Sequence, residues 1–364
     1  MKQSLCFFLC ICALILNSAC SIQINQQSSS TQNAPQPGDE AANIPVTWGS
    51  LNLTGRLIYI VADFKGGSSK GGLRVALRSL DLVTGKVTTS FETQVGGWIR
   101  SLAVAPDLKD LVISYSPSPD EPLGGKEELY VMPLDGSQSP QLLFTPSSDQ
   151  DQYFQPDWSP DGRYIYFTHI NYQSSSATYE VMRLAYPNGK PEQLVNQAYW
   201  PQVSADGSQL TYVSIFSSNG PNGLFTANAD GTDARAVPLS GSGWMNSIID
   251  APLFLPDGQT ILFSAPIPVQ SSAPSWIEKL LGITVVHAHS SIPSDWWTVP
   301  LSGGEPTRLT HVYSPGLSAS LSPDSRFVAS YSASGIFVMN PQGGDLTQIV
   351  NYTGGIAGAV SWIP

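Results

Sequence analysis

A short phrase built on Pro-Asp-Gly returns along the chain, and it restricts the possible folds more than any other feature. Its fullest copy, residues 159–162, lies within the run 154–167. Pro160 supplies the fixed φ of a type I turn, Asp161 can accept bonds from the local backbone, and Gly162 suits the left-handed position that closes a bulged hairpin. The flanking residues are aromatic and β-branched, as strands prefer. The phrase therefore predicts a tight β-hairpin.

The phrase recurs four more times, each time before an apolar run, as Ala105-Pro106-Asp107, Ser204-Ala205-Asp206-Gly207, Leu255-Pro256-Asp257-Gly258 and Ser322-Pro323-Asp324. A sixth copy is divided between the chain ends, because residues 361–364 stop where a turn is due and residues 53–60 begin where one should finish. Successive turn prolines, with Ala205 in the place of one, are 41 to 67 residues apart. A period of about 40 to 50 residues with several short strands indicates a β-propeller. We expect the two ends to meet in one blade.

A second turn phrase occurs six times in the same frame, at residues 80–85, 134–136, 186–189, 229–231, 301–304 and 340–344. Together the two phrases resemble the repeat of the TolB-like propellers, the WD40-like PD40 repeat. Residues 158–162 (Trp-Ser-Pro-Asp-Gly) and 303–310 match that repeat closely, and the resemblance covers about residues 50–364. It implies an all-β, six-bladed propeller of four-stranded antiparallel blades, closed by pairing of the C-terminal strand with the N-terminal blade. It also implies partner binding through a propeller face. TolB itself carries an α/β domain ahead of its propeller, which we expect to be missing here.

The N-terminal residues read as an export signal. Lys2 precedes an apolar run over residues 5–16, which is too short to span a bilayer. Cleavage after residue 19 would leave Cys20 as the only cysteine and the first residue, which resembles a bacterial lipobox whose thiol is acylated. Asn17 stands where that pattern prefers a Leu-like residue, so ordinary cleavage and release stays open as an alternative.

The expected domains are a signal peptide at 1–19, a lipid-anchored disordered tether at 20–45 and the propeller at 46–364. The tether is rich in Gln, Ser, Asn and Pro and cannot bury enough apolar surface to fold. The formal net charge is −11, with no basic cluster. This charge argues against nucleic acid and against electrostatic adhesion to anionic lipid. We expect a protein of the bacterial cell envelope, periplasmic or at the cell surface, that contacts membrane only through its N-terminal lipid.

In a four-stranded meander the B–C and D–A connections share one face of the propeller, which we call the loop face. The long loops fall there, at residues 62–72, 115–127, 169–178, 214–222 and 265–295. An aromatic residue precedes each inner strand in the D–A connections: Trp98, Tyr153, Trp200, Trp244, Tyr313 and Tyr352. These side chains either pack between blades or form a binding rim around the mouth of the central channel.

The longest loop contains residues 275–282, in which Ser275 and Glu278 have capping-box spacing. We predict a short amphipathic helix carrying Trp276, Leu280 and Leu281. Its apolar residues either fold back on the propeller or form a lid or docking element for a partner.

The sequence offers no convincing catalytic residue, metal site or cofactor site. His287 and His289 are two ligands of a metal site that nothing nearby completes, His169 and His311 stand alone, and no Gly-x-Ser-x-Gly elbow is present. We therefore predict a non-enzymatic binding or scaffold protein that recognises a protein, peptide or glycan on its loop face and central channel. The alternative is a propeller hydrolase or lactonase with a divalent metal in the channel, for which Asp157 and Asp250 are the acids on offer.

Overall fold

The computed structural model describes residues 40–63, 74–117, 126–172, 177–215, 223–241, 244, 247–267, 292–344, 346–351 and 358–364. By its internal contacts the chain divides into Met1–Ala34 and Pro35–Pro364, and every described residue lies in the second unit. Within the described ranges, no helix has the length and apolar character needed to cross a membrane.

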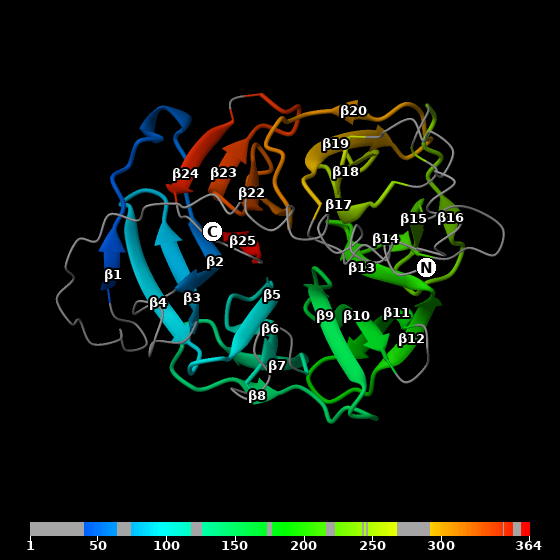
Figure 1. Cartoon of the computed structure of the whole chain (residues 1–364), viewed down its shortest axis with the longest axis horizontal. Coiled ribbons are helices and arrows are strands. Elements are labelled where there is room, and N and C mark those ends of the chain that lie inside the picture. The colour runs from blue at the N-terminus through cyan, green and yellow to red at the C-terminus, as the bar shows by residue number, and fades with distance from the viewer. Residues whose placement is uncertain are drawn as a thin grey trace, which may run out of the picture. The chain divides into compact units, whose positions relative to one another are not determined.

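Six antiparallel sheets stand around one axis, as the blades of a propeller (Figure 1). Blade 1 contains β2 (Arg56–Asp63), β3 (Arg74–Asp81), β4 (Lys86–Glu92), β1 (Glu40–Asn43) and β25 (Val360–Ile363). Blade 2 contains β5 (Trp98–Val104), β6 (Asp110–Ser116), β7 (Glu128–Pro133) and β8 (Gln141–Leu142). Blade 3 contains β9 (Asp151–Trp158), β10 (Tyr164–Asn171), β11 (Thr178–Ala185) and β12 (Glu192–Asn196).

The remaining blades repeat this order. Blade 4 contains β13 (Ala198–Val203), β14 (Gln209–Ser214), β15 (Gly223–Asn228) and β16 (Arg235–Ala236). Blade 5 contains β17 (Asp250–Phe254), β18 (Thr260–Ala265), β19 (Asp295–Pro300) and β20 (Thr307–Arg308). Blade 6 contains β21 (Ser318–Leu321), β22 (Val328–Ser332), β23 (Gly335–Met339) and β24 (Thr347–Asn351). The all-β, six-bladed fold is confirmed.

Blade 1 takes its inner strand from the far end of the chain. β25 pairs antiparallel with β2, and Ile58 lies opposite Ser361. The indole N–H of Trp362 donates to the carbonyl of Thr54 at 2.9 Å. The predicted meeting of the two chain ends is therefore confirmed.

The repeated phrase forms the A–B turns, as predicted. Gly162 has a φ of +71°, and its N–H donates to the Ser159 carbonyl at 2.8 Å. The carboxylate of Asp161 accepts the N–H of Arg163 at 3.0 Å. The two copies that lack glycine keep the same geometry, because Leu108 and Ser325 have φ values of +61° and +60°. The turn conformation is thus imposed even where the side chain disfavours it.

The hydrophobic core lies between the blades. Six clusters of buried apolar side chains each join two neighbouring blades. Tryptophans also bond across these boundaries: the indole N–H of Trp158 donates to the Ala103 carbonyl at 3.2 Å, and that of Trp296 to the Ser330 hydroxyl at 2.7 Å. Each blade therefore depends on both of its neighbours.

A fifth strand was not foreseen in blade 1. β1 pairs with the outer strand β4, so part of the segment expected to be a tether is ordered against the sheet. The following Trp48 is buried, and its indole N–H donates to the Leu82 carbonyl at 2.8 Å. Local composition does not reveal this pairing, because it depends on the free edge of β4.

Several predicted features lie outside the described residues. They are the signal peptide, Cys20, most of the tether, Tyr352, the histidines His287 and His289, and the insertion helix with Trp276, Leu280 and Leu281.

Removing residues 361–364 tests the closure of the ring. The truncation removes the buried side chains of Trp362 and Ile363 and exposes the inner edge of β2. We expect the free energy of unfolding to fall by at least about 3 kcal/mol, the usual effect of losing a buried tryptophan. Urea unfolding measures the change, and Ser361→Ala, which keeps the strand, is the control. A truncated protein that unfolds like the full chain would contradict the closure.

Candidate functional site

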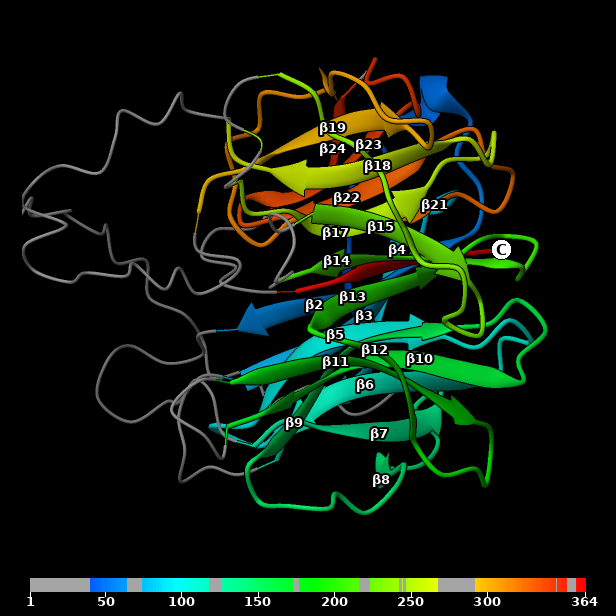
Figure 2. The ribbon, with the colours of Figure 1, turned by 90° about the vertical axis from the view of Figure 1, so that its right-hand side faces the viewer.

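A cavity occupies the central channel of the described propeller. It has a volume of about 660 Å³ and is lined by residues of all six inner strands, β5, β9, β13, β17, β21 and β25. All of these except β21 are labelled around the axis in Figure 1. The inner strands run from the loop face to the face of the A–B turns, and the C-terminus lies at that second face (Figure 2). The channel therefore extends from the beginnings of these strands to their turns.

Two rings of side chains line the channel, and both follow from the turn phrase. Residues three and five positions before each turn proline, with Ala205 in the place of one, line the channel. The residues five positions before form the mouth ring, nearer the loop face: Ser101, Gln155, Trp200, Ala251, Ser318 and Ala359. Those three positions before form the middle ring: Ala103, Asp157, Gln202, Leu253, Ser320 and Ser361.

The described lining of the channel is neutral or acidic. It contains no Lys, Arg or His, and its carboxylates are Asp157, Asp206 and Asp257. Asp206 accepts the N–H of Ser208 at 3.0 Å, and Asp257 accepts the N–H of Gln259 at 2.9 Å, so both are engaged in their own turns. Asp157 is the one acidic member of the two rings.

Asp157 bridges two inner strands. Its Oδ2 accepts the N–H of Val203, on β13, at 2.7 Å. Burial raises the pKa of Asp157 to about 7, although hydrogen bonds from the N–H groups of Val203 and Trp158 and from the Gln202 side chain act to lower it. Part of its surface still faces the channel. The carboxyl is therefore partly accessible from the channel, and burial raises its pKa.

The mouth ring has an unusual backbone. Gln155, Trp200 and Ala251 have φ values of +49°, +55° and +49°, and a proline follows each of them. The register of each strand shifts at this point, so each forms a bulge. The N–H of Gln155 donates to the Ser101 hydroxyl at 2.9 Å, and that of Trp200 to the Thr168 hydroxyl at 2.8 Å. A left-handed tryptophan is strained, and such strain is common at binding sites.

The predicted aromatic rim is placed in several different environments. Trp98, Tyr153 and Trp244 are buried in the clusters between blades. Trp200 is half-buried and lines the channel, whereas Tyr313 is 51% exposed, with the guanidinium carbon of Arg308 4.7 Å from its ring centroid.

These aromatic residues stand at different distances from their turns. Trp200 is five residues before Ala205, but Trp98 is eight before Pro106 and Tyr313 is ten before Pro323. Among the described residues of the predicted aromatic rim, only Trp200 stands five positions before its turn and so belongs to the mouth ring. A role of the others in binding stays a prediction.

Sequence reasoning missed most of the channel lining, including Gln155 and Gln202. Counting back three and five residues from each turn proline, or from Ala205 in blade 4, would have found these residues. Asp157 and Asp250, considered for a metal, do not share a cavity: Asp250 borders a separate space of about 10 Å³ and accepts the Tyr199 hydroxyl at 2.9 Å. Among the described residues, no group of three His, Cys, Asp or Glu side chains is arranged to hold a metal ion.

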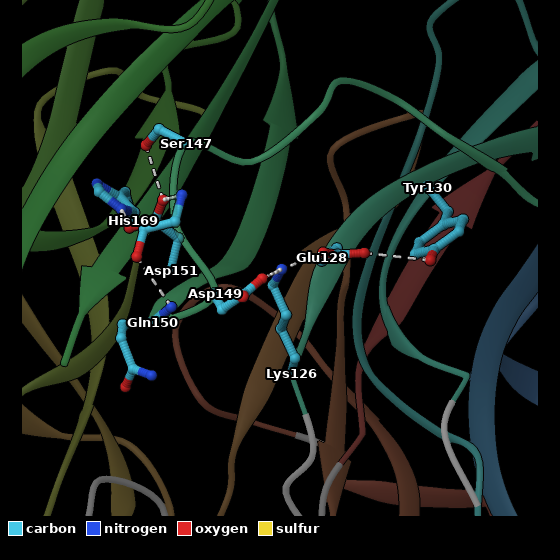
Figure 3. A network of polar contacts seen from close by, with 9 residues as sticks. Lys126, Glu128, Tyr130, Ser147, Asp149, Gln150, Asp151 and His169 are labelled. Atoms are coloured by element: carbon cyan, nitrogen blue, oxygen red, sulfur yellow. Dashed lines mark hydrogen bonds and ion pairs between the residues drawn. The ribbon is translucent and has the colours of Figure 1, made fainter. Parts of the chain in front are cut away.

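A polar network lies near the beginning of β9 (Figure 3). His169 contacts the carboxylates of Asp151 and Glu180 through its two ring nitrogens, each at 2.9 Å. Burial alone would raise the pKa of Asp151, but hydrogen bonds from His169, Asn171 and Ser147 lower it to about 2.

An ion pair adjoins this network. The guanidinium of Arg100 donates to both carboxylate oxygens of Glu127, at 2.7 to 2.9 Å. Glu127 is buried, which raises its pKa against the effect of Arg100. The Ser114 hydroxyl donates to the Tyr153 carbonyl at 2.7 Å, and the Tyr153 N–H donates to the Glu127 carbonyl at 2.9 Å. The bonds that Ser114 and Glu127 make with Tyr153 therefore hold blade 3 to blade 2, whereas the His169 network ties β9, β10 and β11 together within blade 3.

Asp151→Asn tests the network through the dependence of stability on pH. A carboxyl whose pKa is lowered from 3.8 to about 2 on folding stabilises the protein above pH 4, and this contribution disappears as the pH falls toward 2. We expect the variant to lose about 2 kcal/mol at pH 7 and little at pH 2, measured by urea unfolding. Asp149→Asn is the control, since that side chain is 99% exposed. An equal loss at both pH values would contradict the ionic role.

No protein-family model and no curated protein sequence matches the chain. Among solved structures, TolB from Acinetobacter baumannii matches with a TM-score of 0.58 and 15% identity, over 84% of this chain and 66% of that one. A TolB-type protein of Agrobacterium tumefaciens matches with a TM-score of 0.54 and 17% identity, over 86% and 99%. A puromycin-hydrolyzing peptidase of Mycobacterium tuberculosis gives 0.48 and 14%, over 90% and 52%. The chain thus has the fold of the TolB-like six-bladed propellers.

Proposed function

We propose that the protein is an exported binding protein, held at the cell envelope by a lipid on Cys20, that receives a protein or peptide partner at the mouth of its central channel. The observation that carries this proposal is the channel itself. Its volume of about 660 Å³ falls within the range of about 300 to 1,000 Å³ that is usual for ligand sites.

The lining is suited to a polar, extended ligand. Its neutral hydroxyl and amide groups come from Ser101, Gln155, Gln202, Ser318 and Ser320. Such groups exchange hydrogen bonds with peptide N–H and C=O groups without requiring a counter-charge. A peptide segment would therefore keep its backbone satisfied inside the channel.

Trp200 adds an apolar contact at the mouth. It lines the channel and also packs beside clusters formed by blades 4, 5 and 6. Neighbouring blades thus fix the side chain in place, which lowers the entropy lost when a ligand binds. Tryptophans with this combination of rigidity and access dominate binding hot spots. The resemblance to TolB-like repeats supports the same use of the propeller face.

A paired substitution tests the channel mouth against a packing residue. Trp200→Ala should weaken partner affinity by at least about 2 kcal/mol as a hot spot. Trp244→Ala, at a buried site between blades, should instead lower the free energy of unfolding by about 3 to 5 kcal/mol while the folded fraction still binds. The partner is obtained by crosslinking in intact cells, and affinity is then measured with the purified pair. Full affinity of the Trp200 variant would contradict the proposed site, and metal-dependent turnover of a lactone or ester by the wild type would contradict the non-enzymatic role.

The lipid anchor is tested by Cys20→Ser. The wild-type protein should fractionate with membranes and carry acyl mass on its first residue, because the thiol is the attachment point. The variant should appear in the soluble exported fraction. Mass spectrometry of the N-terminus and membrane fractionation measure both outcomes. An unmodified N-terminus on the wild type would exclude the anchor.

A further inference from the structure

We infer that the channel binds an organic cation, a primary ammonium or guanidinium group of the bound ligand, against the carboxylate of Asp157. The inference rests on the proposed function, since it uses the same channel. It adds the chemical class of the group that enters.

The charge of the cavity gives the first argument. The described residues that line it include three carboxylates and no basic side chain. The protein walls of the channel also have a lower dielectric constant than water, so the field of a carboxylate inside is screened less than it is at the surface. An anionic ligand would meet repulsion with no compensating donor charge, whereas a cation would be attracted.

The position of Asp157 gives the second argument, because its negative charge is not needed for the fold. Ser320, on β21, also stands three residues before its turn proline, and it makes the same kind of bond. Its hydroxyl accepts the N–H of Trp362 at 2.9 Å, as the Asp157 carboxylate accepts that of Val203 at 2.7 Å. A neutral side chain therefore suffices to cap the inner edge of the next blade. The carboxylate is an addition to that role.

The ionised form of Asp157 has no cationic partner in the described channel. Asp206 and Asp257 are engaged by hydroxyl and N–H groups of their own turns, whose hydrogen bonds lower their pKa values, to about 2 for Asp206. Asp157, by contrast, has its pKa raised to about 7 by burial. A ligand cation would supply the missing counter-charge and favour the ionised carboxylate.

The neighbouring side chains fit the same ligand class. Trp200 offers an aromatic ring at the mouth, and a tryptophan face attracts ammonium and guanidinium groups. Gln202 stands in the middle ring on the adjacent strand and also bonds to Asp157. Its amide oxygen can accept a further N–H of the cation. The channel thus combines a carboxylate, an aromatic ring and an amide acceptor.

Three nitroxides of equal shape test the inference. They carry a primary amine, a hydroxyl or a carboxylate at the same ring position, and their binding is followed by paramagnetic broadening of alanine methyl signals. Ala103, Ala251 and Ala319 line the channel, and the exposed Ala236 on β16 reports non-specific attraction to the acidic protein. We expect the amine to broaden the channel signals at a concentration about tenfold lower than the hydroxyl probe, as a charge-assisted hydrogen bond implies.

Asp157→Asn is the decisive variant, because asparagine retains an oxygen that can accept the Val203 N–H. The advantage of the amine probe should disappear in this variant and remain in Asp161→Asn, whose carboxyl lies in an exposed turn outside the cavity lining. Equal broadening by the amine and hydroxyl probes in the wild type would overturn the inference. The inference would also be overturned if the advantage of the amine probe were equal in Asp157→Asn and Asp161→Asn.

The wild type gives a second measurement that needs no substitution. Because the cation requires the ionised carboxylate, binding of the amine probe should weaken as the pH falls from 8 to 6, while binding of the hydroxyl probe stays constant. Tyr166, on β10, is the titratable neighbour whose pKa Asp157 affects, and it stays protonated over this range because its pKa is raised. A flat profile would overturn the inference. If the Asp157→Asn variant captured the cellular partner at wild-type yield, the inference would also be overturned. The proposed function would then still stand, because the partner would bind without the carboxylate.

Discussion

No blade of this propeller has a core of its own, and the rest of the structure follows from this constraint. Each sheet is one layer thick, so its apolar side chains are buried only when a neighbouring blade covers them. The six clusters between blades meet this need, and each draws on two blades that are adjacent in the ring. Large aromatic residues such as Trp296 and Tyr166 are buried there. The ring is therefore the unit of stability.

The turns and the closure could be predicted from the sequence because their chemistry is local. Gly162 adopts the left-handed φ that its turn requires, and Ser361 meets Ile58 because the repeat frame continues across the chain ends. The pairing of β1 with β4 and the burial of Trp48 could not be predicted, since they depend on a sheet edge formed by distant residues. For the same reason, an aromatic residue before a strand did not by itself indicate a place at the channel.

The candidate site is found where the repeats differ. Positions that repeat from blade to blade serve the scaffold, as the turn aspartates of blades 2 to 6 do by accepting N–H groups of their own turns. The two channel rings vary from blade to blade, from Ala251 and Leu253 in blade 5 to Gln155 and Asp157 in blade 3. An approximately sixfold framework therefore encloses a channel whose wall presents different side chains on each side. Small side chains, such as Ala359 just before β25 and Ser361 on it, leave room on that part of the wall.

The pairing of β25 with β2 is also delayed during synthesis of the protein. Trp362 bonds to Thr54 across 308 residues, so blade 1 waits for its inner strand until the chain between them has been made. At about 5 to 20 residues per second, this wait lasts roughly 15 to 60 s. During that interval the edge of β2 offers unpaired backbone groups to any other nascent chain. The length of the polypeptide thus determines how long it is open to misassembly, and faster formation of the local hairpins does not shorten that time.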